Sequence, residues 1–207
     1  MGLHKFKQTG FAERHEAPSQ LEPHALELAL CSTDAAQRRH SIWCARPCSA
    51  TTQVLLQHLA IERDSNVQEA LFVALSQSAG EEVVPALLEL LSSEDVLNRN
   101  RALEVLAGFA EQVGQEMPQH LQTADVDKRI FLANLMGELK HPQVAQWIQD
   151  ILLHEPHINV VAAALDVAAE VGDAQTVAAI DVAVQRFADD TFIGFAAEIA
   201  RQRIGVQ

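Results

Sequence analysis

The chain has 207 residues, of which 48% are hydrophobic and only 5% aromatic, with no tyrosine. Its apolar residues are mostly Ala, Leu, Val and Ile, a mixture that suits closely stacked helices better than a β-sandwich or barrel. The formal net charge is −13, and no basic stripe runs along the sequence. Such a surface repels a phosphate backbone, so we expect no nucleic acid partner.

The N-terminal residues carry no apolar run, which predicts neither a secretory signal nor a membrane span. Cys31, Cys44 and Cys48 are an odd number of cysteines and do not indicate a disulfide framework. We therefore expect a cytoplasmic protein. Residues 1–19 are expected to form an irregular N-terminal segment, either a leader or a basic and aromatic peptide that docks on an acidic surface. Residues 20–207 are expected to form the folded domain.

An aspartate recurs at the start of apolar stretches that have the period of a helix. The residues are Asp34, Asp64, Asp95, Asp125 and Asp190, and the first four are spaced by 30, 31 and 30 positions. Aspartate is a good N-cap because its carboxylate accepts a hydrogen bond from the free amides of the first turn, and it suits the positive end of the helix dipole. Each should begin a helix, and His157 or Asn159 should do so in a fifth unit before Asp190.

Another apolar helix precedes each of these helices, and turn signals such as Gly114 separate them. Pro85, Pro118 and Pro142 are predicted at the starts of leading helices, where a missing amide hydrogen has little effect. The expected helix pairs are residues 20–48, 50–78, 80–113, 115–140, 141–171 and 173–204. Because one pair cannot bury its own apolar face, a period of about 30 residues predicts an all-α solenoid of about six pairs. An irregular helical bundle is the alternative.

An arginine four residues after the aspartate, with Ala and Leu at core positions, resembles the repeats of bacterial HEAT-like proteins of the phycobilisome-lyase type. The arginines are Arg38, Arg99 and Arg129, and the matching positions of the other units hold Gln68, Val161 and Gly194. The ladder of Asp and Arg between repeats is therefore expected to be incomplete toward the C-terminus. The resemblance covers residues 20–204 and implies a right-handed α-α superhelix whose second helices line a concave face. It is specific to architecture and not to function.

A possible metal site is suggested by His40, Cys44 and Cys48, whose spacing would align three soft ligands on one face of an unbroken helix. Pro47 disfavours a helix there, and no second cluster of ligands follows. We therefore predict no bound metal, and we expect the cysteines to be packed, reduced thiols.

Two enzyme classes with HEAT-like repeats fit the sequence poorly. Deoxyhypusine hydroxylases hold a di-iron centre with His-Glu pairs at repeat-equivalent positions, but the pairs here, His15-Glu16 and His154-Glu155, lie in the N-terminal segment and at an inter-helix turn. Alkyl-purine DNA glycosylases need a cationic groove and an aromatic cleft. Trp43 and Trp147 instead lie in apolar helical patterns and are predicted to pack in the core.

The sequence contains no motif for a nucleophilic triad, a phosphate loop or paired catalytic carboxylates. We therefore predict no catalytic residue and no cofactor. The expected function is that of a non-enzymatic scaffold or adaptor, with a basic or amphipathic segment of another protein bound on an acidic concave face. The alternative is an accessory lyase or chaperone that assists cofactor attachment to a client protein, which would accelerate a covalent step where a scaffold only binds.

The predicted partner-binding residues are polar positions of the second helices: Gln68, Glu69, Glu104, Asn134, Glu138, Asp166, Glu170 and Glu198. We expect the acidic surface to be strongest in the C-terminal half, because residues 141–198 contain nine acids and one cation. The acidic charge also favours solubility, which is the competing explanation for it.

Overall fold

The computed structural model describes residues 20–205, and within them twelve α-helices account for all regular secondary structure except one isolated β-bridge. The helices are α1 (Pro23–Leu30), α2 (Ala35–Trp43), α3 (Ser49–Leu59), α4 (Ser65–Ser76), α5 (Gly80–Leu90), α6 (Val96–Ala107), α7 (Ala110–Thr123), α8 (Val126–Glu138), α9 (Val144–His154), α10 (Ile158–Val171), α11 (Ala174–Arg186) and α12 (Thr191–Ile204). The expected irregular segment 1–19 lies outside the described residues.

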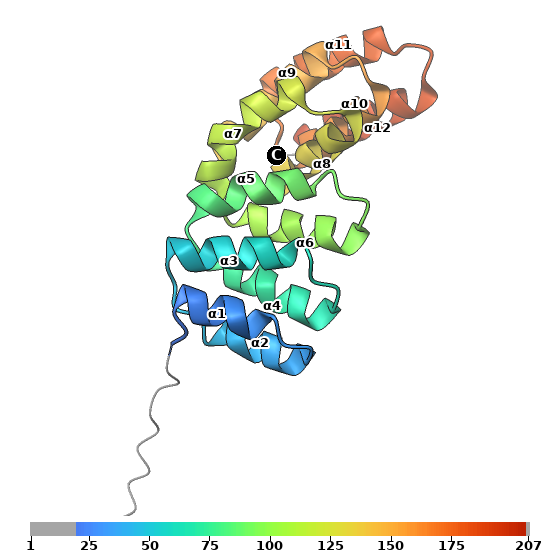
Figure 1. Ribbon diagram of the computed structural model, residues 1–207. Helices are drawn as coiled ribbons and strands as arrows, with labels where there is room; N and C mark the ends of the chain where they lie inside the picture. The colour runs from blue at the N-terminus through green and yellow to red at the C-terminus, as the bar shows by residue number, and fades with distance from the viewer. Residues whose placement is uncertain (1–19, 206–207) are drawn as a thin grey trace, which may run out of the picture.

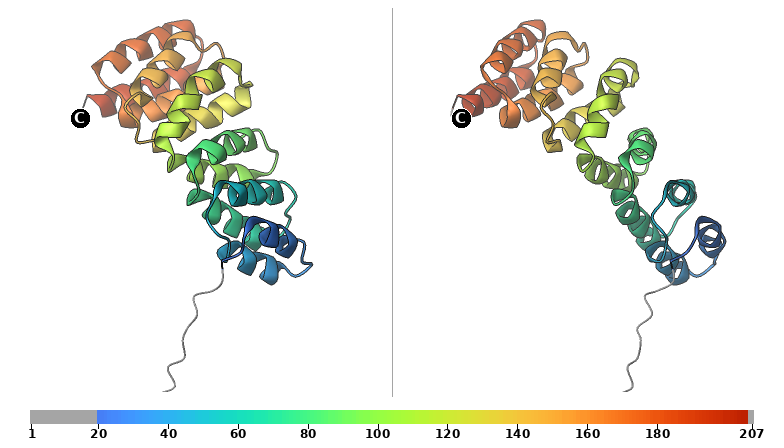
Figure 2. Two further views of the ribbon diagram at one scale, coloured as in Figure 1. Left: turned by 60° about the vertical axis from the view of Figure 1, so that its left-hand side comes forward. Right: turned by 90° about the vertical axis from the view of Figure 1, so that its left-hand side faces the viewer.

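The helices alternate between two rows, which form a curved stack of six helix pairs (Figure 1). Each even-numbered helix packs on the next even-numbered helix, from α2 through to α12. The odd-numbered row is packed in the same way except between α7 and α9. The even row lies on the inner side of the bend and the odd row on the outer side (Figure 2). The prediction of an all-helical solenoid is confirmed.

The aspartates begin the second helices as the sequence predicted. Asp34, Asp64, Asp95, Asp125 and Asp190 are the N-caps of α2, α4, α6, α8 and α12, and each side chain accepts a hydrogen bond from a first-turn amide. His157 is the N-cap residue of α10 but makes no side-chain capping bond in the described structure. Asp173 also caps α11, a leading helix, through a reciprocal pair of bonds with Thr176.

Replacing Asp95 with Ala should lower the free energy of unfolding by about 1 kcal/mol. The Asp95 carboxylate accepts hydrogen bonds from the amides of Leu97 at 2.9 Å and Asn98 at 3.2 Å, and these amides have no partner in the helix itself. Urea denaturation followed by circular dichroism measures the change. Asp127→Ala in the first turn of α8, an exposed acid that is not a cap, is the control. An equal loss in both variants would contradict a capping role for Asp95.

The core is continuous from one pair to the next because equivalent positions of the inner helices are buried. Seven residues after each N-cap, α4, α6, α8, α10 and α12 place a fully buried side chain: Leu71, Ala102, Leu132, Ala164 and Ala197. In α10 and α12 this residue is Ala in both helices, and small side chains allow helix axes to approach. No described helix has both the length and the apolar character needed to cross a membrane.

The boundary between the third and fourth pairs was predicted wrongly. Gly114 is not a turn residue but lies buried inside α7, which begins at Ala110. The space beside Gly114 is filled by the His141 ring, because a Cβ atom there would lie 2.5 Å from His141 Nε2. Pro85 and Pro118 also lie inside α5 and α7 and not at their starts, although each removes one helical hydrogen bond.

Two predictions about packing were also wrong. Trp43 is the last residue of α2 and is 55% exposed, whereas Trp147 is 5% exposed, as predicted. The cysteines are not packed thiols: Cys31 and Cys48 are exposed and Cys44 is half-buried. α2 ends at Trp43, so His40, Cys44 and Cys48 do not share one helix.

Candidate functional site

Two arginines of the second helices, Arg38 and Arg129, join successive pairs, but their acidic partners are glutamates of the next loop. Arg38 of α2 donates to the carboxylate of Glu62 through Nε at 2.7 Å and Nη2 at 2.9 Å, and to the carbonyl of Ser32 through Nη1. Arg129 of α8 repeats this pattern with Glu155 and the carbonyl of Ala124. The aspartates expected as ladder partners act as caps instead.

Where the arginine is missing, other side chains hold the loops. Gln68 in α4 donates to the carbonyl of Glu62 at 3.0 Å, and its Oε1 accepts a bond from Arg101 of α6. Toward the C-terminus Arg186 of α11 donates to the carbonyls of Leu152 and Glu155. The ladder is therefore incomplete in its arginines, as predicted, but the loop carbonyls still have partners.

The structure separates the predicted partner-binding residues into two groups. Gln68 is buried and holds the loop before α4, so it is not available to a partner. The other seven are exposed on the inner helices: Glu69, Glu104, Asn134, Glu138, Asp166, Glu170 and Glu198. They come from α4, α6, α8, α10 and α12, and so extend along the whole inner row.

Glu69 and Glu104 lie at a groove of about 570 Å³ between α4 and α6. Apolar side chains make up much of its lining, from Phe72 and Val73 on one side and Leu97 and Val105 on the other. Arg101 also lines the groove, where Ser65 and Gln68 accept its hydrogen bonds. The groove therefore combines an apolar lining with two carboxylates.

The C-terminal half of the inner face is less acidic than the count for residues 141–198 suggested. Glu170 of α10 pairs with Arg203, and Glu198 accepts a hydrogen bond from Gln202 and lies 3.8 Å from Arg201. Arg201 and Arg203 lie after residue 198, and their side chains pair with acids within residues 141–198. Concentration of the site in the C-terminal half is therefore not supported, and the exposed acids Glu69, Glu104, Glu138 and Asp166 are spread along the row.

Large exposed apolar side chains also lie on the inner helices, and the sequence reasoning missed them. They are Trp43, Val73, Val96, Leu97, Phe192, Phe195 and Ile199. On α12 the sequence does show the second apolar face, because Phe192, Phe195 and Ile199 are spaced by three and four residues. They lie beside the buried stripe, which consists of Ile193, Ala196, Ala197 and Ala200. A helix with two apolar faces can bury one and offer the other to a partner.

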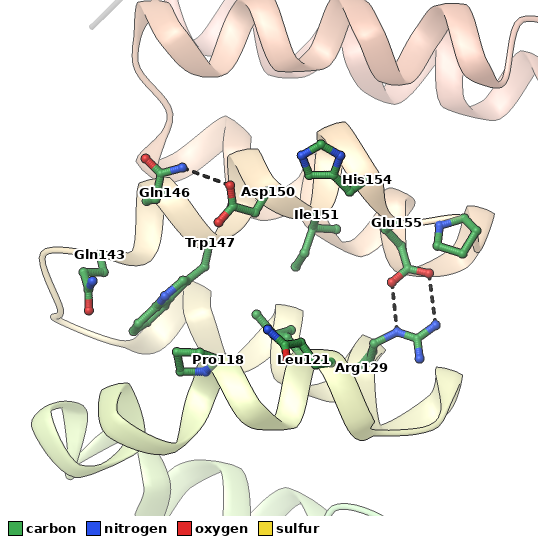
Figure 3. Close-up of a pocket in the computed structure, with 12 residues that line it drawn as sticks. Pro118, Leu121, Arg129, Gln143, Gln146, Trp147, Asp150, Ile151, His154 and Glu155 are labelled. Carbon is green, nitrogen blue, oxygen red and sulfur yellow. Dashed lines mark hydrogen bonds and ion pairs between the residues drawn. The ribbon is translucent and has the colours of Figure 1, made fainter.

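A hollow lies on the outer side, where α7 and α9 diverge. It has a volume of about 850 Å³, and Trp147 and Ile151 of α9 point toward Pro118 and Leu121 of α7 (Figure 3). The paired side chains of Arg129 and Glu155 close one end. At the other end the Trp147 ring stacks on His141, with ring centroids 4.9 Å apart and an angle of 11° between the planes.

Between residues 20 and 205, no group of three or more His, Cys, Asp or Glu side chains is placed to hold a metal ion. The His154-Glu155 pair is divided, because Glu155 is buried against Arg129 while His154 is exposed. The arrangement is suited to binding through an apolar lining and carboxylates.

A comparison with protein-family models and with curated proteins finds no match to this chain.

Proposed function

We propose that the protein is a non-enzymatic scaffold or adaptor of the HEAT-like type that acts in the cytoplasm. Its inner face binds an amphipathic helical segment of another protein, with apolar residues on one side and lysines or arginines on the other. The observation that carries the proposal is the combination of exposed apolar side chains and unpaired carboxylates along the even-numbered helices of the described chain.

The groove between α4 and α6 supports an amphipathic partner. Its apolar lining would bury the partner's apolar side, while Glu69 and Glu104 would lie beside the partner's cations. Glu138 and Asp166 continue the acidic surface onto α8 and α10. Charges of opposite sign mainly accelerate association and select the partner, so the on-rate should fall as salt is added.

Replacing Glu69, Glu104 and Glu138 together with Gln should weaken binding of a basic amphipathic peptide by about tenfold, since each exposed ion pair contributes only a little. The probe is a fluorescent helical peptide of about 18 residues, or five turns, with leucines on one face and lysines on the other. Fluorescence anisotropy gives the dissociation constant.

The matched control changes Glu27, Glu81 and Glu111 to Gln on the outer helices α1, α5 and α7. Both triple variants alter the net charge by the same amount, so non-specific attraction would weaken equally in both. We expect less than a twofold change in the control. Equal weakening in both triples, absence of binding by the unmodified protein, or equal binding of a peptide with glutamates in place of its lysines would overturn the proposal.

A further inference from the structure

The helix α12 carries an exposed apolar stripe whose side chains could pair with those of an identical helix that runs in the opposite direction. Phe192, Phe195 and Ile199 are 58%, 64% and 38% exposed and lie on one face of the helix. Arg203 follows on the same face four residues after Ile199, and Asp189 precedes the helix, three residues before Phe192. In the sequence, the stripe is thus preceded by an acid in the turn before the helix and followed by a base.

The stripe faces the inner side of the bend. Arg203 bonds to Glu170, which is exposed on the inner helix α10, so the face that carries Arg203 is turned toward that side. The face with Arg201 is turned the other way, because Arg201 donates to Asp181 of the outer helix α11. The apolar stripe is therefore accessible beside α10 and is not covered by α11.

We propose that α12 pairs with α12 of a second copy of this chain in an antiparallel arrangement about a twofold axis. Phe195 then lies near Phe195 of the partner subunit at the axis, and Phe192 lies against the partner's Ile199. Asp189 of each copy lies near the partner's Arg203. Such an interface is isologous, so each contact occurs twice.

The helix geometry permits this register. On the helix, Phe192 and Ile199 are equally far from the midpoint between residues 195 and 196. Asp189, in the turn before the helix, and Arg203 differ by one residue in their distance from that midpoint. The flexible arginine side chain spans that difference. Its guanidinium has several donors, so Arg203 can retain Glu170 while it binds an aspartate of the partner subunit.

Charge distinguishes a second copy from the partner of the proposed function. A uniformly basic segment would meet Arg203 at one end of the stripe, whereas the reversed stripe presents an acid there. One helix pair buries less than the roughly 800 Å² per subunit of a standard interface, so we expect a dimer that dissociates in the micromolar range.

The first test is sedimentation equilibrium of the full chain over a range of micromolar concentrations. The unmodified protein should approach twice its 22.7 kDa mass, and Phe195→Glu should remain a monomer. Val182→Glu is the matched control, because it places the same charge at an exposed apolar residue of α11 outside the stripe. Circular dichroism confirms folding. A monomeric unmodified protein, or equal dissociation by both variants, would overturn the proposal.

The second test exchanges the charges. Asp189→Arg and Arg203→Asp should each abolish self-association, since like charges then face each other twice. An equimolar mixture should restore a heterodimer, because each arginine again faces an aspartate. Asp189 is not the N-cap residue, so its replacement leaves the Asp190 cap in place. Two results together exclude α12 as the interface: the mixture of the two charge variants stays monomeric, and Phe195→Glu dimerises as strongly as the unmodified protein. Neither test uses the probe peptide, so a negative result for the dimer leaves the proposed peptide binding unaffected.

Discussion

Replacing Glu62 with Ala is expected to lower the free energy of unfolding by about 3–5 kcal/mol, because it leaves the arginine of a buried ion pair without its partner. The Glu62 carboxylate accepts two bonds from Arg38, one each from the backbone amides of Arg63 and Asp64, and lies 2.9 Å from His58 Nε2. It therefore ties the first pair to the loop of the second. Chemical denaturation at neutral pH measures the loss.

The acid dependence of stability provides a second measurement at the same residue. Burial alone would raise the pKa of Glu62, but the hydrogen bonds from Arg38, the two amides and His58 outweigh it and lower the pKa to about 2. A carboxyl whose folded pKa is depressed stabilises the fold above its unfolded pKa, about 4.5, and loses that contribution as the pH falls toward 2. Glu62→Gln should flatten this part of the profile.

Glu69→Gln is the control for Glu62→Gln, because Glu69 is exposed on α4. It should leave both the stability at pH 7 and its decline below pH 4.5 within experimental error of the unmodified protein. If Glu62→Gln retains the full decline between pH 4.5 and 2, the stabilising role assigned to the ionised Glu62 is wrong.

Replacing Trp147 with Ala is expected to destabilise the fold by about 3–5 kcal/mol, the usual loss for a large aromatic residue in a core. Trp147 is 5% exposed, stacks on His141 and lines the hollow between α7 and α9. Its removal would extend that hollow to the buried side of α9 and release the ring that fills the space beside Gly114. Urea denaturation measures the effect.

The second tryptophan supplies an internal control. Trp43 is 55% exposed, so Trp43→Ala should change the free energy of unfolding by no more than about 0.5 kcal/mol. Each variant retains one tryptophan, and the emission of Trp147 in Trp43→Ala should lie at shorter wavelength than that of Trp43 in Trp147→Ala. Similar losses of stability in the two variants would contradict the burial described for Trp147.

The repeat could be predicted because the signals that begin its second helices are local. An aspartate at the N-cap acts on amides two and three residues away, so Asp34, Asp64, Asp95 and Asp125 predict helix starts without knowledge of the fold. The leading helices were harder, because only α11 begins with a side-chain cap among the described leading helices. Gly114 was misinterpreted because α7 has no side-chain cap to mark its start at Ala110. The contact of Gly114 with His141, which is distant in sequence, could not be predicted from local signals either.

The candidate site was predictable in its outline and not in its pairing. The second helices do line the inner side, and seven of the eight predicted polar residues are exposed there. Net charge could not show which acids are paired, because Glu170 meets Arg203 only after α10 and α12 pack together. The exposure of Trp43 likewise depends on where α2 ends relative to its neighbours, which helical periodicity does not report.

The divergence of α7 and α9 has a mechanical consequence. A stack of helices resists bending where both rows are packed and yields where one row is open. Between the fourth and fifth pairs the inner helices α8 and α10 remain in contact, while the outer row is interrupted by the hollow. The solenoid should therefore behave as two stiff arms joined by a compliant joint, with the groove of α4 and α6 on one arm and α12 on the other. Flexing at this joint changes the span across the inner face without separating any packed inner helices.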